Sequence, residues 1–294
     1  MSPLVSVIIP AYNAERFISE TIESVVNQTF SDFELLIVDD GSTDNQKKII
    51  KEFAASDNRI RYIHQLNEGV SAARNNGFKN SCGQFIAFLD ADDVWLPDNL
   101  ALKINRFGSD EVGLVHSDAM VINEASEKIE GTICGIEGDL LDPLLLWDGT
   151  QIPGPSSILV KREVMEAIGV FDEKLSTAAD KDFFIRVAAQ YRIGRVSQVT
   201  WKYRLHRKNM HKNISVMEAD ILLLYQKARN SKLFHNKDFE KKCFSAMYLI
   251  LAASWAGDGK NVRRSLIFIW QAVKINPPVI LYVVKRLVNK WLLN

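Results

Sequence analysis

The stretch that decides the fold is Phe85-Ile86-Ala87-Phe88-Leu89-Asp90-Ala91-Asp92-Asp93. Its five consecutive apolar residues are typical of a strand that is buried on both faces of a parallel sheet. Three acids follow within four positions. Because an unpaired carboxylate is costly to bury, they must leave the sheet edge toward solvent, a ligand or a cation. An Asp-x-Asp pair at a strand end can hold a hard divalent cation that also binds substrate phosphates. An acid could instead cap the helix expected after Asp98, but one cap needs only one acid.

The first hundred residues alternate between strand and helix patterns. Short apolar, β-branched runs predict strands, and apolar stripes of helical period predict the helices between them. The expected strands are 4–9, 33–38, 60–64 and 85–89, and two of the expected helices are 14–28 and 70–80. This alternation predicts βαβ units and a mostly parallel sheet, whose right-handed crossovers bring the carboxyl ends of the strands to one edge. The side chains expected at that edge are Tyr12, Asp39, Asp40, Asp90 and Asp92.

The glycine-rich phosphate loops of two common nucleotide folds do not occur in the sequence. No Gly-x-Gly-x-x-Gly follows the first strand, and no Gly-x-x-x-x-Gly-Lys is found anywhere. A dinucleotide fold and a P-loop are therefore disfavoured. An acid-rich edge without such a loop indicates that a cation, rather than backbone amides, neutralises a bound phosphate.

Composition describes an ordinary globular chain. Of 294 residues, 36 are Lys or Arg and 36 are Asp or Glu, so the chain has no nucleic-acid-binding charge excess. Three unclustered cysteines argue against a disulfide framework or a zinc site and suit a reducing cytoplasm. The amino terminus lacks a basic segment before its apolar run, unlike a signal peptide. No window reaches the ~18 apolar residues of a membrane-spanning helix.

The segment 177–191 is the second informative stretch. Thr177 and Asp180 resemble a capping box, and apolar residues of helical period follow them. Asp180 falls on the buried side at the start of this helix, where it either carries chemistry or merely complements the helix dipole. A last strand, 196–204, leads to His206 and His211, and an isolated histidine is most often a surface residue.

Helical patterns dominate from about residue 212. We therefore expect one domain of residues 1–210 and a helical region of residues 211–294. From Lys260 to Asn294 there are seven basic residues and no acid. The pattern of 277–293 predicts a basic amphipathic helix, which lies either in a membrane interface or on neighbouring helices. Together with the cysteine usage, this suggests a cytoplasmic protein that can sit on the inner face of the cell membrane.

Four motifs together resemble the family 2 glycosyltransferases, in order and in spacing over residues 4–205. They are Val5-Ser6-Val7-Ile8-Ile9-Pro10-Ala11-Tyr12-Asn13, Val38-Asp39-Asp40-Gly41-Ser42-Thr43-Asp44, Asn67-Glu68-Gly69-Val70-Ser71-Ala72-Ala73-Arg74-Asn75 and Asp90-Ala91-Asp92-Asp93. The resemblance implies a GT-A fold, in which a nucleotide-binding α/β half and an acceptor-binding half share one domain. It also implies inverting transfer from a nucleotide-diphosphate sugar with Mg²⁺ or Mn²⁺.

The resemblance further implies roles for individual residues. Asp39 would accept a hydrogen bond from the base, often uracil; Arg74 would approach the base or diphosphate, and Asp90 the ribose. Asp92 would bind the metal, with His206 beside it and Asp93 as a further candidate. The other residues implied in the nucleotide site are Pro10, Tyr12, Asn13, Asp40, Asn67, Gly69 and Ala91.

The catalytic base of the family lies in a Glu-Asp pair that opens a late helix. Here the Asp is kept as Asp180, but the preceding Glu is replaced by Ala179. Two other functions remain open, a sugar-nucleotidyltransferase and a non-catalytic nucleotide-sugar-binding protein. The acceptor expected from the basic helical tail is a saccharide or lipid-linked saccharide at the membrane face, as in surface polysaccharide assembly.

Overall fold

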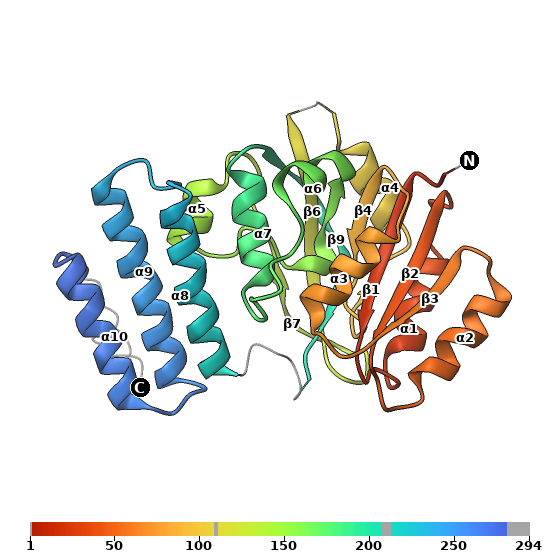
Figure 1. Ribbon diagram of the computed structural model, residues 1–294, viewed down its shortest axis with the longest axis horizontal. Helices are drawn as coiled ribbons and strands as arrows, with labels where there is room; N and C mark the ends of the chain where they lie inside the picture. Colours follow the sequence, from red (N-terminus) through yellow and green to blue (C-terminus); the bar gives the residue numbers. More distant parts are fainter. Residues whose placement is uncertain (1, 109–110, 207–212, 281–294) are drawn as a thin grey trace. The chain divides into compact units, whose positions relative to one another are not determined.

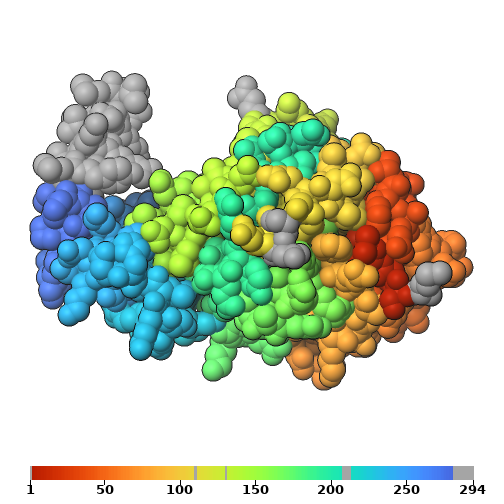
Figure 2. Space-filling view, turned by 90° about the horizontal axis from the view of Figure 1, so that it is seen from above, coloured from red at the N-terminus to blue at the C-terminus, as the bar shows by residue number. Residues whose placement is uncertain are grey.

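The computed structural model describes residues 2–108, 111–206 and 213–280. By its internal contacts the chain divides into two compact units, 1–141 with 149–209 and 142–148 with 210–294. In the space-filling view the red, orange, yellow and green segments of the first unit pack into one continuous surface (Figure 2). The domain boundary that the sequence predicts near residue 210 stays a prediction.

The first unit is built on a nine-stranded sheet with helices on it (Figure 1). Its strands are β1 Val5–Ala11, β2 Phe33–Asp40, β3 Ile60–Gln65, β4 Phe85–Phe88, β5 Val94–Trp95, β6 Val112–Ile122, β7 Lys128–Ile133, β8 Leu159–Lys161 and β9 Arg192–Arg204. Its helices are α1 Ile18–Val26, α2 Gln46–Ser56, α3 Val70–Lys79, α4 Asn99–Asn105, the 3₁₀ turn η1 Pro155–Ser157, α6 Arg162–Ile168 and α7 Ala179–Ala188.

The strand order is β3-β2-β1-β4-β8-β6-β9-β5, with β7 paired to β6. The first four strands are parallel, while β8 runs antiparallel to both β4 and β6, and β5 runs antiparallel to β9. Every residue of β1 and β2 is buried, as expected for parallel strands covered on both faces. The sequence prediction of an α/β fold with a mostly parallel central sheet is confirmed.

Two local predictions were wrong. The residues of 156–160 predict one continuous strand, but Pro155 opens a 3₁₀ turn and β8 begins only at Leu159. Proline has no N–H for a sheet ladder and its fixed φ suits the start of a helical turn. The capping box at Thr177 is also absent, because α7 begins at Ala179 and its N-cap, Ala178, makes no side-chain cap bond.

The second unit is helical. It contains most of α5 (Leu141–Leu146), together with α8 (Ile214–Asn230), α9 (Lys237–Ala256) and α10 (Val262–Ile275), which lie side by side in Figure 1. Glu218 of α8 accepts hydrogen bonds from Trp255 Nε1 at 2.6 Å and from Arg264 Nε at 2.7 Å, so one buried carboxylate joins three helices. Of the described helices, none is long and apolar enough to cross a bilayer. The helix predicted over 277–293 falls mostly outside the described residues, as does His211.

Candidate active site

The sheet register brings the predicted residues to one edge. Ala11 pairs with Asp39, and Asp39 with His64, so the carboxyl ends of β1, β2 and β3 lie level. Leu89 N bonds to Ile8 O at 3.0 Å, which places the Asp90–Asp93 turn beside the end of β1. The antiparallel pairing of β5 with β9 then returns the end of β9 to that turn. The edge therefore gathers residues from both ends of the first unit.

Asp39 is almost fully buried, with 1% of its surface exposed. Its carboxylate accepts hydrogen bonds from Tyr62 Oη at 2.6 Å, Gln46 Nε2 at 2.9 Å and Ser42 N at 3.0 Å. Burial opposes its ionisation, but these hydrogen bonds outweigh burial and hold the pKa of Asp39 below its ordinary value. Asp39 is thus a fixed anionic acceptor at the end of β2.

Asp40 shapes the neighbouring turn. Its carboxylate accepts from Gln65 Nε2 at 2.8 Å and from the backbone N–H groups of Glu68 and Gly69 at 2.9 Å each. Gly69 has a φ of +93°, which other residues rarely adopt. Gly41 is needed too, because a Cβ there would lie 2.7 Å from Asn67 N. These contacts place Asn67 and Gly69 at the sheet edge. The Asp40 carboxylate stabilises the turn that contains them.

The loop after β1 is tied to the loop after β2. Asn13 Oδ1 accepts from Thr43 N at 2.8 Å, and Asn13 N donates to Ser42 Oγ at 3.0 Å. Pro10 is buried within β1, whereas Tyr12 is 53% exposed and open to a ligand. Gln46 was not identified from the sequence, yet it is fully buried and bonds Asp39, Ala11 O and Ala14 N. A polar residue at the start of an otherwise ordinary helix gave no sequence signal for this role.

Arg74 reaches the edge from α3. Its Nη2 donates to Asp90 Oδ1 at 2.6 Å, and its guanidinium lies over the ring of Phe171, 5.2 Å from the centroid. Arg74 is 5% exposed, and its Nε is buried without a hydrogen-bond partner among the described residues. The helix itself is held by Asn75, whose side chain bonds both Phe171 O at 2.9 Å and Phe171 N at 3.0 Å. The Arg74–Asp90 pair is therefore a fixed charged element of the site.

Asp92 and His206 meet at the far end of the same turn. His206 Nε2 lies 2.6 Å from Asp92 Oδ2, and the imidazole stacks on Phe17 with ring centroids 5.4 Å apart. Ala91, between the two aspartates, is largely buried, and its carbonyl accepts from Thr21 Oγ1 at 2.9 Å. The structure thus brings together two residues that the sequence separates by more than a hundred positions.

Asp93 is buried behind this pair. It accepts from Ser156 Oγ at 2.6 Å and from Arg204 N at 3.0 Å. Burial, followed by the negative charges of Asp92 and Asp90, raises the pKa of Asp93 well above its ordinary value. Ser156 also accepts from Asp90 N at 3.1 Å, so a single hydroxyl braces both ends of the acidic turn.

Asp180 lies at the start of α7 and is partly buried. Burial raises its pKa, and the charge of Asp90 acts in the same direction, while Arg74 and Lys181 act against it. Lys181 donates to Gln151 Oε1 at 2.9 Å, and burial lowers its pKa to about 7. Tyr203, which was not identified from the sequence, is influenced by the same acids. Burial, followed by the charges of Asp93, Asp92, Asp90 and Asp180, raises its pKa.

The donor chemistry at Asp92 and His206 fits a divalent cation. A carboxylate oxygen and an imidazole nitrogen converge there, and both are common ligands of divalent ions. Within the described parts of the chain, no three His, Cys, Asp or Glu side chains are grouped to hold a metal. Two protein ligands leave most coordination positions to substrate oxygens and water, which is the usual arrangement for ions that bind phosphates.

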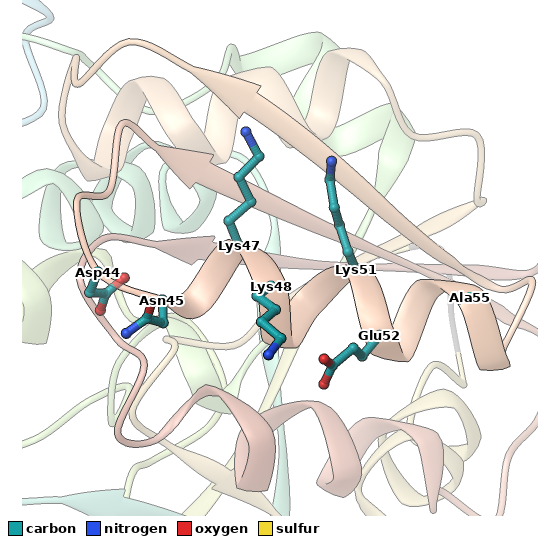
Figure 3. Close-up of a pocket in the computed structure, with 7 residues that line it drawn as sticks. All are labelled: Asp44, Asn45, Lys47, Lys48, Lys51, Glu52 and Ala55. Carbon is teal, nitrogen blue, oxygen red and sulfur yellow. The ribbon is translucent and has the colours of Figure 1, made fainter.

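A shallow depression along α2 lies apart from these residues. Its lining comes from one helix and the turn before it: Asp44, Asn45, Lys47, Lys48, Lys51, Glu52 and Ala55. Lys47 and Lys51 extend to one side of the helix in Figure 3. Because neighbouring elements contribute none of these residues, the depression is an open helix surface and not an enclosed site.

The fold is that of a glycosyltransferase. The chain belongs to glycosyl transferase family 2, whose model matches residues 6–169. An uncharacterised glycosyltransferase of Rickettsia felis is 34% identical over 202 residues, which cover 68% of this chain and 33% of that protein. The UDP-Glc:α-D-GlcNAc-diphosphoundecaprenol β-1,3-glucosyltransferase WfgD of Escherichia coli is 40% identical over 124 residues, covering 42% of this chain and 48% of WfgD. The chain thus spans about a third of the length of the first of these relatives.

Two solved structures share the fold. S. aureus TarS 1-349 in complex with UDP-GlcNAc has a TM-score of 0.64 at 17% identity, covering 93% of this chain and 80% of that one. The mannosyltransferase PcManGT of Pyrobaculum calidifontis, in complex with GDP-Man and Mn²⁺, has a TM-score of 0.64 at 17% identity, covering 98% and 81%. The GT-A-like architecture expected from the sequence motifs is confirmed by these neighbours.

Proposed function

We propose that the chain is an inverting glycosyltransferase that moves a sugar from a UDP-sugar to a hydroxyl of a saccharide or lipid-linked saccharide acceptor. The observation that carries the proposal is that Asp92 and His206 lie 2.6 Å apart at the sheet edge, while Asp180, whose pKa is raised, feels the charge of Asp90 in the same acidic turn. Donor binding needs a cation site, and acceptor deprotonation needs a base. The charges of Arg74 and Asp90, which are paired with each other, both act on the pKa of Asp180.

The nucleotide half of the donor would bind at the ends of β1 and β2. Asp39 is held as an anionic acceptor, which suits the N–H of a pyrimidine base, and exposed Tyr12 can cover that base. Arg74 supplies a fixed cation, and Asp90 an acceptor for ribose hydroxyls. The contacts of Asn13, Asn67 and Gly69 shape the loops around this space.

Asp92 and His206 would hold Mn²⁺ or Mg²⁺, which when bound offsets negative charge on the leaving diphosphate. Asp180 takes the proton of the acceptor hydroxyl as its oxygen bonds to the anomeric carbon. The bond from that carbon to the diphosphate oxygen breaks, and its electron pair leaves with the nucleotide. A base whose pKa is raised toward working pH accepts a proton more readily than an ordinary carboxylate. A single displacement from the opposite face inverts the anomeric configuration.

The proposed acceptor follows from the chain's own tail and from a relative. The printed name of WfgD specifies a diphosphoundecaprenol-linked sugar, which is a lipid-linked acceptor. The segment from Lys260 onward is basic and without acids, a composition that anionic lipid surfaces attract. We therefore place the proposed reaction at the inner face of the membrane, in surface polysaccharide assembly.

A panel of nucleotide sugars tests the proposal. The purified chain is incubated with each sugar, with and without Mn²⁺, and the released nucleoside diphosphate is measured. Slow hydrolysis of one or a few UDP-sugars that depends on Mn²⁺ and is lost in Asp180→Asn is expected. Pyrophosphate formation from a nucleoside triphosphate and a sugar phosphate would instead identify a nucleotidyltransferase. Binding without any turnover, in the presence of candidate acceptors, would identify a sensor.

A further inference from the structure

Arg204, the last residue of β9, has more polar contacts around the Asp90–Asp93 turn than its place in the sequence suggests. Its side chain is 1% exposed. Its Nε donates to Asp92 O at 2.7 Å, and its own N–H donates to Asp93 Oδ1 at 3.0 Å. Arg204 therefore holds both the backbone carbonyl of Asp92 and the side chain of Asp93.

The other half of the guanidinium anchors this arrangement to two distant elements. Arg204 Nη2 donates to Glu20 Oε2 of α1 at 2.6 Å, and Nη1 donates to Ser126 Oγ in the β6–β7 turn at 2.8 Å. Ser126 in turn donates to Glu20 at 2.8 Å, which closes a ring of three residues. Arginine suits this position because its fork presents several donors in one plane, which a lysine cannot do.

Phe17 links Arg204 to the other member of the cation-binding pair. The guanidinium lies over the Phe17 ring, 4.8 Å from its centroid, and the His206 imidazole stacks on the same ring at 5.4 Å. Asp92 is thus fixed through its carbonyl and His206 through its ring plane. One buried guanidinium therefore contacts both the Asp92 carbonyl and the ring on which His206 stacks.

We propose that Arg204 is a positioning residue that holds Asp92 and His206 in the geometry that binds a divalent cation, an assignment that rests on the proposed function of this pair. Residues that orient metal ligands without touching the metal commonly change its affinity by about 10- to 100-fold when they are replaced. Arg204 has this relation to both ligands, through a hydrogen bond to one and a shared aromatic ring to the other.

Mn²⁺ affinity in the presence of UDP, measured from the free-ion electron paramagnetic resonance signal, tests the proposal. We expect Arg204→Lys to bind Mn²⁺ about 10- to 100-fold more weakly, while UDP without metal binds as in the wild type. Glu20→Gln should weaken Mn²⁺ in the same direction by a smaller factor, and it decides the question if Arg204→Lys does not fold. The matched control is Arg195→Lys on the same strand, which loses a comparable pair with Asp118 but should leave Mn²⁺ affinity unchanged.

The outcomes distinguish the cation-binding role of Asp92 and His206 from the positioning role of Arg204. If Asp92→Asn weakens Mn²⁺ binding but Glu20→Gln and Arg204→Lys do not, the cation pair is right and the positioning role is wrong. If Asp92→Asn itself binds Mn²⁺ like the wild type, the pair is misassigned and the positioning role falls with it. Equal losses in Arg204→Lys and Arg195→Lys would show a general loss of structure and would also overturn the role.

Discussion

His206 Nε2 lies 2.6 Å from Asp92 Oδ2, although the two residues come from different ends of the catalytic fold. The antiparallel pairing of β5 with β9 produces this contact, since Val94 lies opposite Lys202 and Trp95 opposite Trp201. One imidazole nitrogen and one carboxylate oxygen therefore lie within hydrogen-bond distance of each other. Because these two residues are the proposed cation ligands, metal-dependent and metal-independent nucleotide binding can be measured separately.

Asp92→Asn should remove most of the gain in nucleotide affinity that a divalent ion provides. An amide is a neutral and weaker ligand than a carboxylate, so we expect UDP to bind about tenfold or more weakly with Mn²⁺ present. Isothermal titration of UDP with and without Mn²⁺ measures the difference. Asp98→Asn is the control, because Asp98 is exposed and its carboxylate accepts from Thr29 Oγ1 at 2.9 Å. Equal Mn²⁺ enhancement in Asp92→Asn and the wild type would contradict the assignment.

Asp39 should contribute stability that disappears in acid. Its pKa is lower in the folded protein than in the unfolded chain, so the contribution is complete above the unfolded value of about 4 and is lost as pH falls through the lower folded value. We expect Asp39→Asn to cost about 2 kcal/mol of unfolding free energy at neutral pH. Below about pH 4 the difference from the wild type should shrink. Urea unfolding at a series of pH values measures this, and a constant difference would contradict it.

Asp180→Asn should abolish sugar transfer and leave donor binding intact, because an amide cannot accept the acceptor's proton. In the wild type, kcat should fall on the acid side of a pH higher than that of an ordinary carboxyl, since burial raises the pKa of Asp180. Product assays and UDP-sugar titration over a pH series measure both. Asp182→Asn is the control two residues further along the helix, where the carboxylate pairs with Arg186 at 2.9 Å. It should lower thermal stability yet retain turnover.

The sequence predicted the sheet edge because apolar runs and acids repeat there in a simple order. The runs ending at Asp39 and Asp90 are short and continuous, and parallel topology alone brings their ends together. Which of two adjacent acids holds a turn could not be predicted from local sequence. Asp40 and Asp39 are neighbours of the same type, yet one holds a turn and the other accepts from Tyr62.

The supporting residues were missed for a physical reason. Gln46, Ser156 and Arg204 act through hydrogen bonds to residues far away in the chain, and no local period or spacing records such contacts. The capping box at Thr177 failed in the opposite way, since the local pattern was present but α7 begins only at Ala179.

The outer face of α10 should bind anionic membranes. Val262, Leu266 and Trp270 are 67%, 59% and 58% exposed at helical spacing, and Lys274 Nζ lies 5.0 Å from the Trp270 ring centroid. Replacing Leu266 and Trp270 by Glu should lower binding to anionic vesicles by about tenfold or more, because apolar anchors are replaced by negative charges that the anionic lipids repel. Sedimentation with anionic and with zwitterionic vesicles measures this. Leu222→Glu, on α8, is the control, and unchanged binding in the α10 variant would exclude this face.

Arg74 and Asp90 should shift the pH dependence of turnover in opposite directions. The charge of Arg74 lowers the pKa of Asp180, the charge of Asp90 raises it, and Lys181 acts with Arg74. Arg74→Gln should therefore move the acid limb of the kcat profile to higher pH, and Asp90→Asn should move it to lower pH. A shift of a few tenths to one pH unit is expected for partly screened charges, as one unit corresponds to about 1.4 kcal/mol.

The measurement is kcat at saturating donor, so that weaker donor binding by either variant does not distort the profile. Arg59→Gln is the matched control, because Arg59 pairs with Asp57, 2.6 Å away, and contributes no charge effect to Asp180. Shifts in the same direction for both variants would contradict the electrostatic coupling. Opposite shifts in Arg74→Gln and Asp90→Asn, with none in Arg59→Gln, would tie the acid limb of the kcat profile to Asp180, because Arg74 and Asp90 act on the pKa of this carboxyl in opposite directions.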